Sequence, residues 1–209
     1  MWLLVAVFLI DWTVNKNHPV AMPKIGQEPI RRAALMEATV AEIGEAGSLD
    51  VTVSKIARRA GMSSALAHHY FGGKAQIFLA AMRHILTEYA TEVRSALAAA
   101  PEGGRLEAII AANFADSCFR SDTVAAWLNF YVLARREPEA ARLLHVYQRR
   151  LHSNLVHALR DRADNPDAVA QQIAALIDGV YLRAALSGNG VEGAACQVIE
   201  TAHALMRTT

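Results

Sequence analysis

The sequence predicts an all-α protein in which a small N-terminal helical domain precedes a larger helical body. First, apolar side chains recur every three or four residues through most of the 209-residue chain, a spacing typical of helices that bury one face. Second, β-branched residues never alternate with polar ones over a useful length, as they do in strands. Third, glycine or proline separates successive periodic segments by short turns, which is typical of helical proteins.

The first half of the chain is predicted to hold three short helices and a long one. Thr52 and Ser63 are hydroxyl residues of the kind that caps a helix, because their oxygens accept a hydrogen bond from a first-turn amide. Glycines follow the periodic segments and act as stops. The predicted helices are 29–45, 53–60, 64–70 and 74–100, and the glycines that end them are Gly47, Gly61, Gly72 and Gly73.

Longer amphipathic helices are predicted in the second half, after a break that contains a proline and two glycines at 101–104. Turn residues at 121–122, 138, 165–166 and 188–190 separate them. The predicted helices are 105–119, 122–136, 138–161, 166–187 and 192–206. We therefore divide the chain into residues 22–74 and 75–209.

The first 21 residues are predicted to be an extension outside both domains. Its apolar run of ten residues, 1–10, is too short to cross a bilayer as a helix, which takes about 20 residues. No basic residue precedes the run, and Asp11 and Trp12 stand where a signal peptide needs small residues. We expect Met22 to be the functional start, and we expect no membrane partner.

Composition argues against several function classes. The two cysteines, Cys118 and Cys196, share no metal-ligand spacing, so they are typical of a reduced, cytoplasmic protein. Adjacent histidines such as His68 and His69 diverge by about 100° on a helix and suit no single metal. Nucleophile-elbow, phosphate-loop and dinucleotide motifs are all missing from the sequence. We predict no enzyme activity, no metal and no cofactor.

Residues 53–70 have the features that a helix-turn-helix requires. Small residues at Ala57, Ala60 and Ala67 permit two short helices to pack closely across the turn at 61–62. Ser63 at the cap leaves the next turn free to enter a major groove, where base pairs differ in their donors and acceptors. The side chains predicted to face outward are Ser64, Ala65, His68 and His69. Short helix pairs with glycine turns also occur in bundles that bind no DNA, so periodicity alone leaves both interpretations open.

The run IARRAGMSSALAHHYFGGK resembles the signature of the TetR family of transcriptional regulators. The resemblance extends from Met22 onward, through TVAAWLNFYV, RRLHSNL and AALIDGVYLRAALSG, and is strongest to family members that repress glycine-betaine synthesis genes and respond to choline. It implies a homodimer on an inverted-repeat operator in double-stranded DNA. It also implies that Tyr70 and Lys74 contact phosphates, that Thr52 caps its helix against a phosphate, and that the third helix reads bases. The alternative is a TetR-like repressor with another small hydrophobic or cationic effector.

A dimer interface is predicted on the last two helices. The helix 168–186 is apolar nearly all round, so it needs cover on two sides. In TetR-like proteins the last two helices pair with their symmetry mates in a four-helix bundle, and a buried central helix of a monomer is the alternative. The predicted interface residues are Ala175, Gly179, Leu182, Leu186, Ile199 and Ala202.

An aromatic stripe and a carboxylate indicate an effector site in the body. The stripe projects from one face of the helix 122–136, where a core stripe is the plainer interpretation. Asp178 stands in an apolar helix with Tyr181 one turn later, so its charge needs a partner such as Arg183, a neighbouring helix or a ligand. Aromatic rings beside a carboxylate suit a quaternary ammonium cation. The predicted ligand-binding residues are Phe114, Trp127, Phe130, Tyr131, Asp178 and Tyr181.

Overall fold

The computed structural model describes residues 26–187 and 192–208, and within them every regular element is helical, which confirms the predicted all-α class. The extension at 1–21 and the break at 188–190 lie outside the described residues. The elements are α1 (Gln27–Ala46), α2 (Val53–Arg59), α3 (Ser64–Phe71), α4 (Lys74–Ala99), α5 (Arg105–Ala112), the 3-10 helix η1 (Asp116–Phe119), α6 (Ser121–Ala134), α7 (Pro138–Leu159), α8 (Pro166–Ser187) and α9 (Ala194–Thr208).

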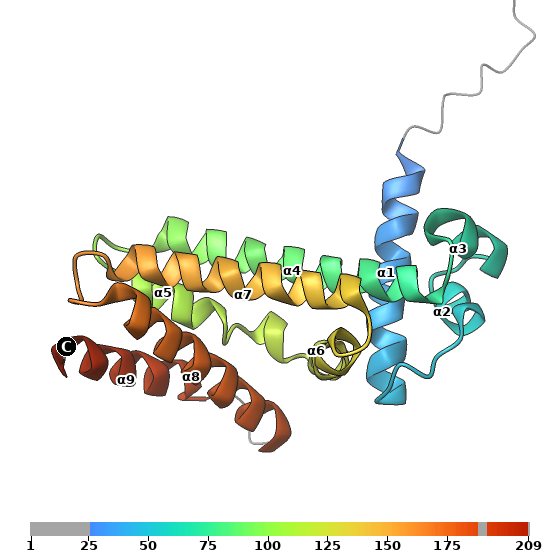
Figure 1. Cartoon of the computed structure of the whole chain (residues 1–209). Helices are drawn as coiled ribbons and strands as arrows, with labels where there is room; N and C mark the ends of the chain where they lie inside the picture. The colour runs from blue at the N-terminus through green and yellow to red at the C-terminus, as the bar shows by residue number, and fades with distance from the viewer. Residues whose placement is uncertain (1–25, 188–191, 209) are drawn as a thin grey trace, which may run out of the picture.

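The helices form a three-helix unit at one end of an elongated body (Figure 1). Helices α1, α2 and α3 gather at that end, and α4 runs from them into the body beside α7. Helices α8 and α9 lie on the opposite side of the body from α4. None of the helices within the described residues is long and apolar enough to cross a membrane.

Two apolar cores hold this arrangement. The first joins α1, α2, α3 and the start of α4 to α6, around Leu35, Ile56 and Phe130. The second joins α5, α7, α8 and α9, around Ile110 and Leu155. Because the first core includes α6, the three-helix unit packs on the body through apolar contacts and is not joined to it by the chain connection alone.

The predicted helix starts and stops of the three-helix unit are confirmed. Thr52 Oγ1 accepts a hydrogen bond from the amide of Lys55 at 3.2 Å, and Ser63 Oγ accepts one from the amide of Leu66 at 3.2 Å. Gly61 adopts a positive φ of 68°, which L side chains rarely tolerate, so the turn between α2 and α3 favours glycine.

The helix predicted over 105–119 is shorter than expected, since α5 ends at Ala112 and the chain continues into η1. Asn113 supplies the physical reason. Its Nδ2 donates to the carbonyl of Ile109 at 2.7 Å, and its Oδ1 accepts a hydrogen bond from Tyr89 Oη at 2.9 Å. The buried amide therefore bonds one turn back on its own helix and also across to α4, and the turn that follows brings η1 toward α4.

Glu107 joins three parts of the body. It accepts a hydrogen bond from Arg162 at 3.0 Å and contacts His203 Nε2 at 2.7 Å, so it links α5 to the turn after α7 and to α9. Partial burial raises the pKa of this carboxyl, but the bonds from Arg162 and His203 outweigh it and hold the pKa at about 2. Glu107 is therefore charged throughout the neutral range.

Candidate DNA-binding surface and effector cavity

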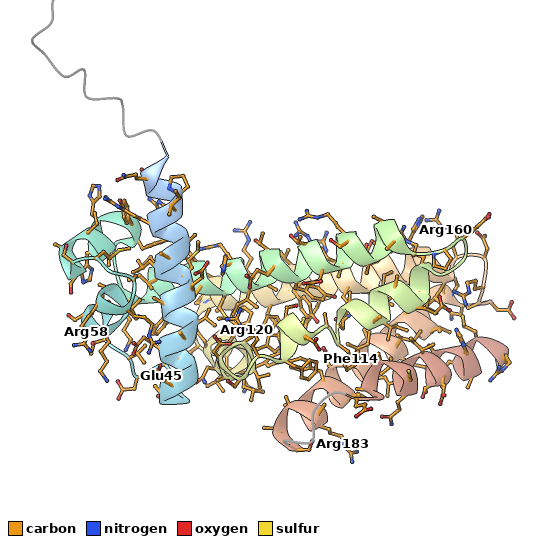
Figure 2. The ribbon with its side chains drawn as sticks, turned by 180° about the vertical axis from the view of Figure 1, so that it is seen from behind. Glu45, Arg58, Phe114, Arg120, Arg160 and Arg183 are labelled. Atoms are coloured by element: carbon orange, nitrogen blue, oxygen red, sulfur yellow. The ribbon has the colours of Figure 1, made fainter. Side chains whose placement is uncertain are left out.

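Helices α2 and α3 form the predicted helix-turn-helix. Ala57 and Ala67 are fully buried where the two helices meet, and Phe71 is half-buried on the same inward side of α3. Ala65, His68 and His69 are exposed on the outer side, as predicted. Figure 2 shows Arg58 and Glu45 at this end of the molecule and Arg160 at the other.

The polar side chains of α3 differ in whether they already form hydrogen bonds within the protein. Ser64 Oγ donates to Ser54 Oγ at 3.1 Å, and His68 Nδ1 contacts the carbonyl of Gly72 at 2.8 Å. Among the described residues, the side chain of His69 has an aromatic contact with the ring of Tyr70, at 5.8 Å between centroids, and no hydrogen bond or ion pair. His69 and Ala65 are therefore the predicted base readers that are least engaged by the protein itself.

Basic side chains flank α3. Lys74 begins α4, and its Nζ lies 5.5 Å from the ring of Phe78. The guanidinium of Arg32, on α1, lies 5.3 Å from the ring of Tyr70 and 4.9 Å from that of Phe71. Arg32 was not among the predicted site residues, because nothing in its own segment places it beside Tyr70.

Arg59 holds α2 against α1. It donates to Glu42 at 2.7 Å and also binds Glu45, so its charge is neutralised within the protein. The hydrogen bond to Glu42, followed by that to Glu45, raises the pKa of Arg59 further. Arg58 is exposed beside it without an ion pair among the described residues. Of these two adjacent arginines, only Arg58 has its charge available to an external anion.

A cavity of about 60 Å³ lies in the body where α4, η1, α6, α7 and α8 meet. Its walls combine aliphatic, aromatic and acidic side chains, and within the described part of the chain no lysine, arginine or histidine contributes to them. The lining residues are Ile85, Leu86, Glu88, Tyr89, Asn113, Ser117, Cys118, Thr123, Trp127, Tyr147, Ile177, Asp178 and Tyr181.

The aromatic rings of the cavity are held in place by one another and by hydrogen bonds. The ring of Tyr147 stands edge-on to those of Trp127 and Tyr89, with centroids 5.2 and 5.5 Å away. Tyr181 Oη donates to the carbonyl of Cys118 at 3.0 Å. Burial raises the pKa of Tyr89, Tyr147 and Tyr181, so these hydroxyls stay neutral. The rings therefore form a preorganised, uncharged wall.

Asp178 brings a carboxylate into this wall without a partner. No hydrogen bond or ion pair reaches its side chain from any described residue, and burial raises its pKa to about 6. The predicted alternative, a pair with Arg183, is not formed, and Arg183 is exposed. A largely enclosed carboxylate of this kind is stabilised by a cation in the cavity.

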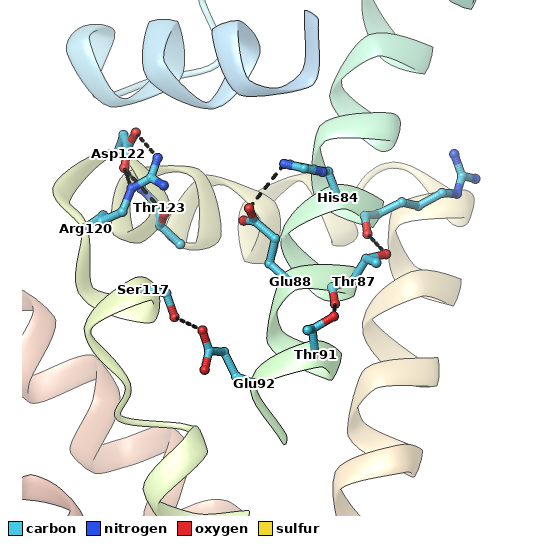
Figure 3. Close-up of polar contacts among 10 residues, drawn as sticks. His84, Thr87, Glu88, Thr91, Glu92, Ser117, Arg120, Asp122 and Thr123 are labelled. Atoms are coloured by element: carbon cyan, nitrogen blue, oxygen red, sulfur yellow. Dashed lines mark hydrogen bonds and ion pairs between the residues drawn. The ribbon is translucent and has the colours of Figure 1, made fainter. Parts of the chain in front are cut away.

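The other acidic groups near the cavity do have partners (Figure 3). Glu88 lies 3.4 Å from His84 Nε2, and Glu92 accepts a hydrogen bond from Ser117 at 3.1 Å. Glu88 is half exposed, whereas Asp178 is largely enclosed. Asp178 is therefore the acidic group in this region that most lacks a counter-charge.

The structure brings together half of the predicted ligand-binding residues. Trp127, Asp178 and Tyr181 line the cavity. Phe130 is buried in the core that α6 shares with α1 and α4, and Phe114 packs beside Phe119, so neither of these two predicted residues lines the cavity. The ring of Tyr131 packs against that of Trp127, with their centroids 5.6 Å apart, but Tyr131 does not line the cavity.

Sequence reasoning missed cavity residues from other helices, above all Glu88, Tyr89, Asn113 and Tyr147. Tyr89 and Tyr147 lie 58 positions apart and meet only through the packing of α4 on α7. An aromatic or acidic residue on the inward stripe of a long helix is the one signal that the sequence offered.

The predicted interface residues of α8 form one exposed face. Ala175 and Gly179 are exposed, as are Leu182 at 42% and Leu186 at 67%. A Cβ added at Gly179 meets no atom within 4 Å, so nothing in the protomer requires glycine there. On α9, Ile199 is half-buried, but Ala202 is fully buried in the protomer's own core, so its prediction as a contact residue is wrong.

The helix-turn-helix, the enclosed cavity and the all-helical body define a class of two-part regulators, in which one part binds DNA and the other binds a small molecule. Residues 35–81 match the family described as bacterial regulatory proteins of the tetR family, and residues 102–207 match the BetI-type transcriptional repressor C-terminal family. The chain belongs to the TetR family and carries a BetI-type C-terminal domain.

Curated relatives agree with this assignment. The chain is 50% identical over 177 residues to the HTH-type transcriptional regulator BetI of Brucella suis biovar 1 (strain 1330), a match that spans 83% of this chain and 89% of that protein. It is 48% identical over 168 residues to BetI of Rhizobium meliloti (strain 1021), across 79% and 83% of the two chains. The chain is a DNA-binding transcriptional repressor, and its likeness to regulators confirms that it is not an enzyme.

Solved structures share the fold. A putative transcriptional regulator from Pseudomonas aeruginosa PAO1 superposes with a TM-score of 0.75 at 25% identity, over 86% of this chain and 91% of that one. A putative transcriptional regulator from Saccharomonospora viridis, solved in complex with choline, has a TM-score of 0.73 at 21% identity, over 82% and 95%. The predicted TetR-like architecture is therefore confirmed.

Proposed function

We propose that the protein is a cytoplasmic, homodimeric repressor of genes that convert choline to glycine betaine, and that choline in the body cavity weakens its hold on an inverted-repeat operator. The observation that carries this proposal is Asp178, a largely enclosed carboxylate that pairs with no described residue, in a cavity walled by tyrosine and tryptophan rings. The S. viridis regulator, solved in complex with choline, supports the same effector, and the likeness to BetI regulators supports the role in transcription.

The chemistry of the wall fits a quaternary ammonium group. Such a group has no N–H to donate, so rings and charge must hold it, and each desolvated ring contributes about 0.5–2 kcal/mol. Trp127, Tyr147 and Tyr181 supply the rings, and Asp178 supplies the charge. Together these terms support an affinity in the micromolar to millimolar range.

The charge of the wall also favours choline over glycine betaine. Glycine betaine carries a carboxylate next to its trimethylammonium group, and the cavity offers two carboxylates but no basic side chain to receive it. The like charges repel in a site of low dielectric. A sensor with this wall responds to the precursor and ignores the osmoprotectant itself.

Choline binding does not by itself release the operator, because a ligand shifts a conformational equilibrium only by the difference between its affinities for the two conformations. Two helices that line the cavity also reach the three-helix unit. Helix α4 begins at Lys74 beside α3, and α6 packs on α1. A coupling of about 1–3 kcal/mol between cavity and DNA surface changes operator affinity some 5- to 150-fold.

Operator binding in the presence of three ligands tests the proposal. Choline should weaken binding, whereas its uncharged isostere 3,3-dimethylbutanol and glycine betaine should act far more weakly. Trp127→Ala should remove the choline response, while Phe114→Leu, which changes an aromatic residue outside the cavity, should keep it. Equal action of choline and dimethylbutanol, or a full response in Trp127→Ala, would refute the cationic site.

A different cation is the second candidate, because the same wall accepts other methylated ammonium compounds. Tetramethylammonium and betaine aldehyde distinguish the cases. If either releases the operator at a lower concentration than choline, the site is right and the effector is different.

A further inference from the structure

A second apolar recess lies on the outside of the body, in the groove between α4 and α7. We call it the α4–α7 groove, and its volume is about 220 Å³. Aliphatic side chains from both helices form its floor, and Tyr89 and Tyr147 form part of its base. Its lining residues are Leu86, Tyr89, Ala90, Val93, Arg94, Leu97, Val146, Tyr147, Arg150, Leu151 and Asn154.

The groove is separate from the predicted dimer face. That face lies on α8 and α9, which are on the opposite side of the body from α4 (Figure 1), and the groove shares no lining residue with it. The two surfaces can therefore be occupied at the same time.

The charge at the groove is purely basic. Arg94 from α4 and Arg150 from α7 line it from opposite walls, and none of the described aspartates and glutamates does. Arg94 donates to Thr91 Oγ1 at 2.9 Å, a neutral acceptor, and neither arginine forms an ion pair with a described residue. Two exposed guanidinium groups beside an apolar floor favour a ligand with an apolar chain and an anionic head.

The length of the apolar floor narrows the ligand class. On α4 the floor runs from Leu86 to Leu97, which at 1.5 Å per residue is about 16 Å. This length suits an extended hydrocarbon chain better than a compact aromatic metabolite. We propose that the α4–α7 groove binds a fatty carboxylate, with its chain on the aliphatic floor and its carboxylate between Arg94 and Arg150.

The groove shares a wall with the choline cavity. Leu86, Tyr89 and Tyr147 line both spaces, and the rings of the two tyrosines pack edge to face with their centroids 5.5 Å apart. A chain pressed against Tyr147 also bears on Trp127, which is 5.2 Å from that ring. Occupancy of the groove should therefore change choline affinity, although the binding of a fatty carboxylate does not depend on choline being the effector.

Calorimetric titration of the full chain with decanoate, kept below its micellar concentration, tests the groove. We expect binding that weakens at least tenfold in Arg94→Gln/Arg150→Gln, and that weakens similarly when decanol replaces decanoate. Affinity should rise about twofold to fourfold per added methylene from octanoate to decanoate, since each buried methylene adds a nearly constant increment to the binding free energy.

A matched pair of variants controls for loss of charge. Arg142→Gln/Arg149→Gln removes two exposed arginines of α7 that lie outside the groove, and it should leave decanoate binding unchanged. Equal loss in both double variants would mean that the anion is drawn by general charge, which overturns the site. Absence of decanoate binding to the wild-type chain would also overturn the site. So would loss of decanoate binding in Trp127→Ala with no loss in Arg94→Gln/Arg150→Gln, because decanoate would then occupy the choline cavity.

Discussion

Gly44 of α1 lies directly against Asp122 of α6. A Cβ added at Gly44 would stand 2.6 Å from both the Cα and the Cβ of Asp122, closer than real Cβ contacts come. Asp122 is itself held by Arg120 at 2.8 Å (Figure 3), and nearby Asn129 Nδ2 donates to the carbonyl of Gly47 at 3.3 Å. The body thus meets the DNA-binding unit through backbone approach and not only through side chains.

Gly44→Ala should destabilise the protein. Helix propensity alone would stabilise the variant by about 1 kcal/mol, but the methyl group meets backbone and forces α1 and α6 apart, which costs about 1–3 kcal/mol. We expect the melting temperature to fall by a few degrees. We also expect operator affinity to change, because α1 supports α3. A higher melting temperature with unchanged operator binding would show that the two helices do not approach so closely.

Choline affinity should depend on pH through Asp178. Its pKa is raised to about 6 by burial, so it is charged at pH 7.5 and mostly neutral at pH 5. Choline binding measured by calorimetry should therefore weaken as the pH falls below about 6, approaching tenfold per pH unit. In Asp178→Asn this dependence should vanish and affinity at pH 7.5 should be low. A flat profile in the wild-type protein would remove Asp178 as the counter-charge.

The same carboxylate should make the empty protein less stable at neutral pH. Its folded pKa of about 6 exceeds the ordinary value of 3.8, so the folded state binds more protons between these values and stability falls as pH rises through that window. The charged form costs on the order of 3 kcal/mol. Asp178→Asn should therefore melt at a higher temperature than wild type at pH 7.5, and the difference should shrink toward pH 4. Lower stability of the variant at both pH values would contradict the assignment.

Gly179→Asp should separate the proposed dimer. A charge placed within an apolar interface loses its hydration, whereas in the lone protomer the new side chain projects into open space. Sedimentation velocity should therefore show monomers, with unchanged helical circular dichroism and weak operator binding. Gln148→Asp, on the exposed surface of α7, is the charge control and should remain dimeric. A dimeric Gly179→Asp protein would place the interface elsewhere.

His69 and Lys74 should contribute differently to DNA binding. His69→Ala should cost about 1–3 kcal/mol on the operator and relax preference at one base step, since a base contact carries sequence information. Lys74→Ala should weaken specific and random DNA alike and lower the salt dependence, as expected for a phosphate contact. Titrations on both DNAs at several salt concentrations separate the roles. Equal loss of operator and random-DNA binding in His69→Ala would reassign that side chain to the backbone.

The DNA-binding unit was predictable from sequence because its determinants are local. Thr52, Ser63 and Gly61 act within a few residues of their own positions, and each does in the structure what its chemistry indicates. The cavity was only half predictable, because its wall is a tertiary product. Helical spacing placed Trp127 and Phe130 on one face, but that face meets the cavity at Trp127 and the interdomain core at Phe130. Only the packing of α6 between neighbours decides which residue lies where.

The position of α6 has a consequence for anyone who wishes to convert this protein into a biosensor for another compound. Thr123 and Trp127 line the cavity from a helix that is also pressed against α1, so redesigning them risks changing the response and the basal repression together. Ile177, Asp178 and Tyr181 line the same cavity from α8, which packs mainly on α7 and α9. Libraries confined to α8 should therefore alter ligand preference with less leakage of the reporter gene than libraries on α6.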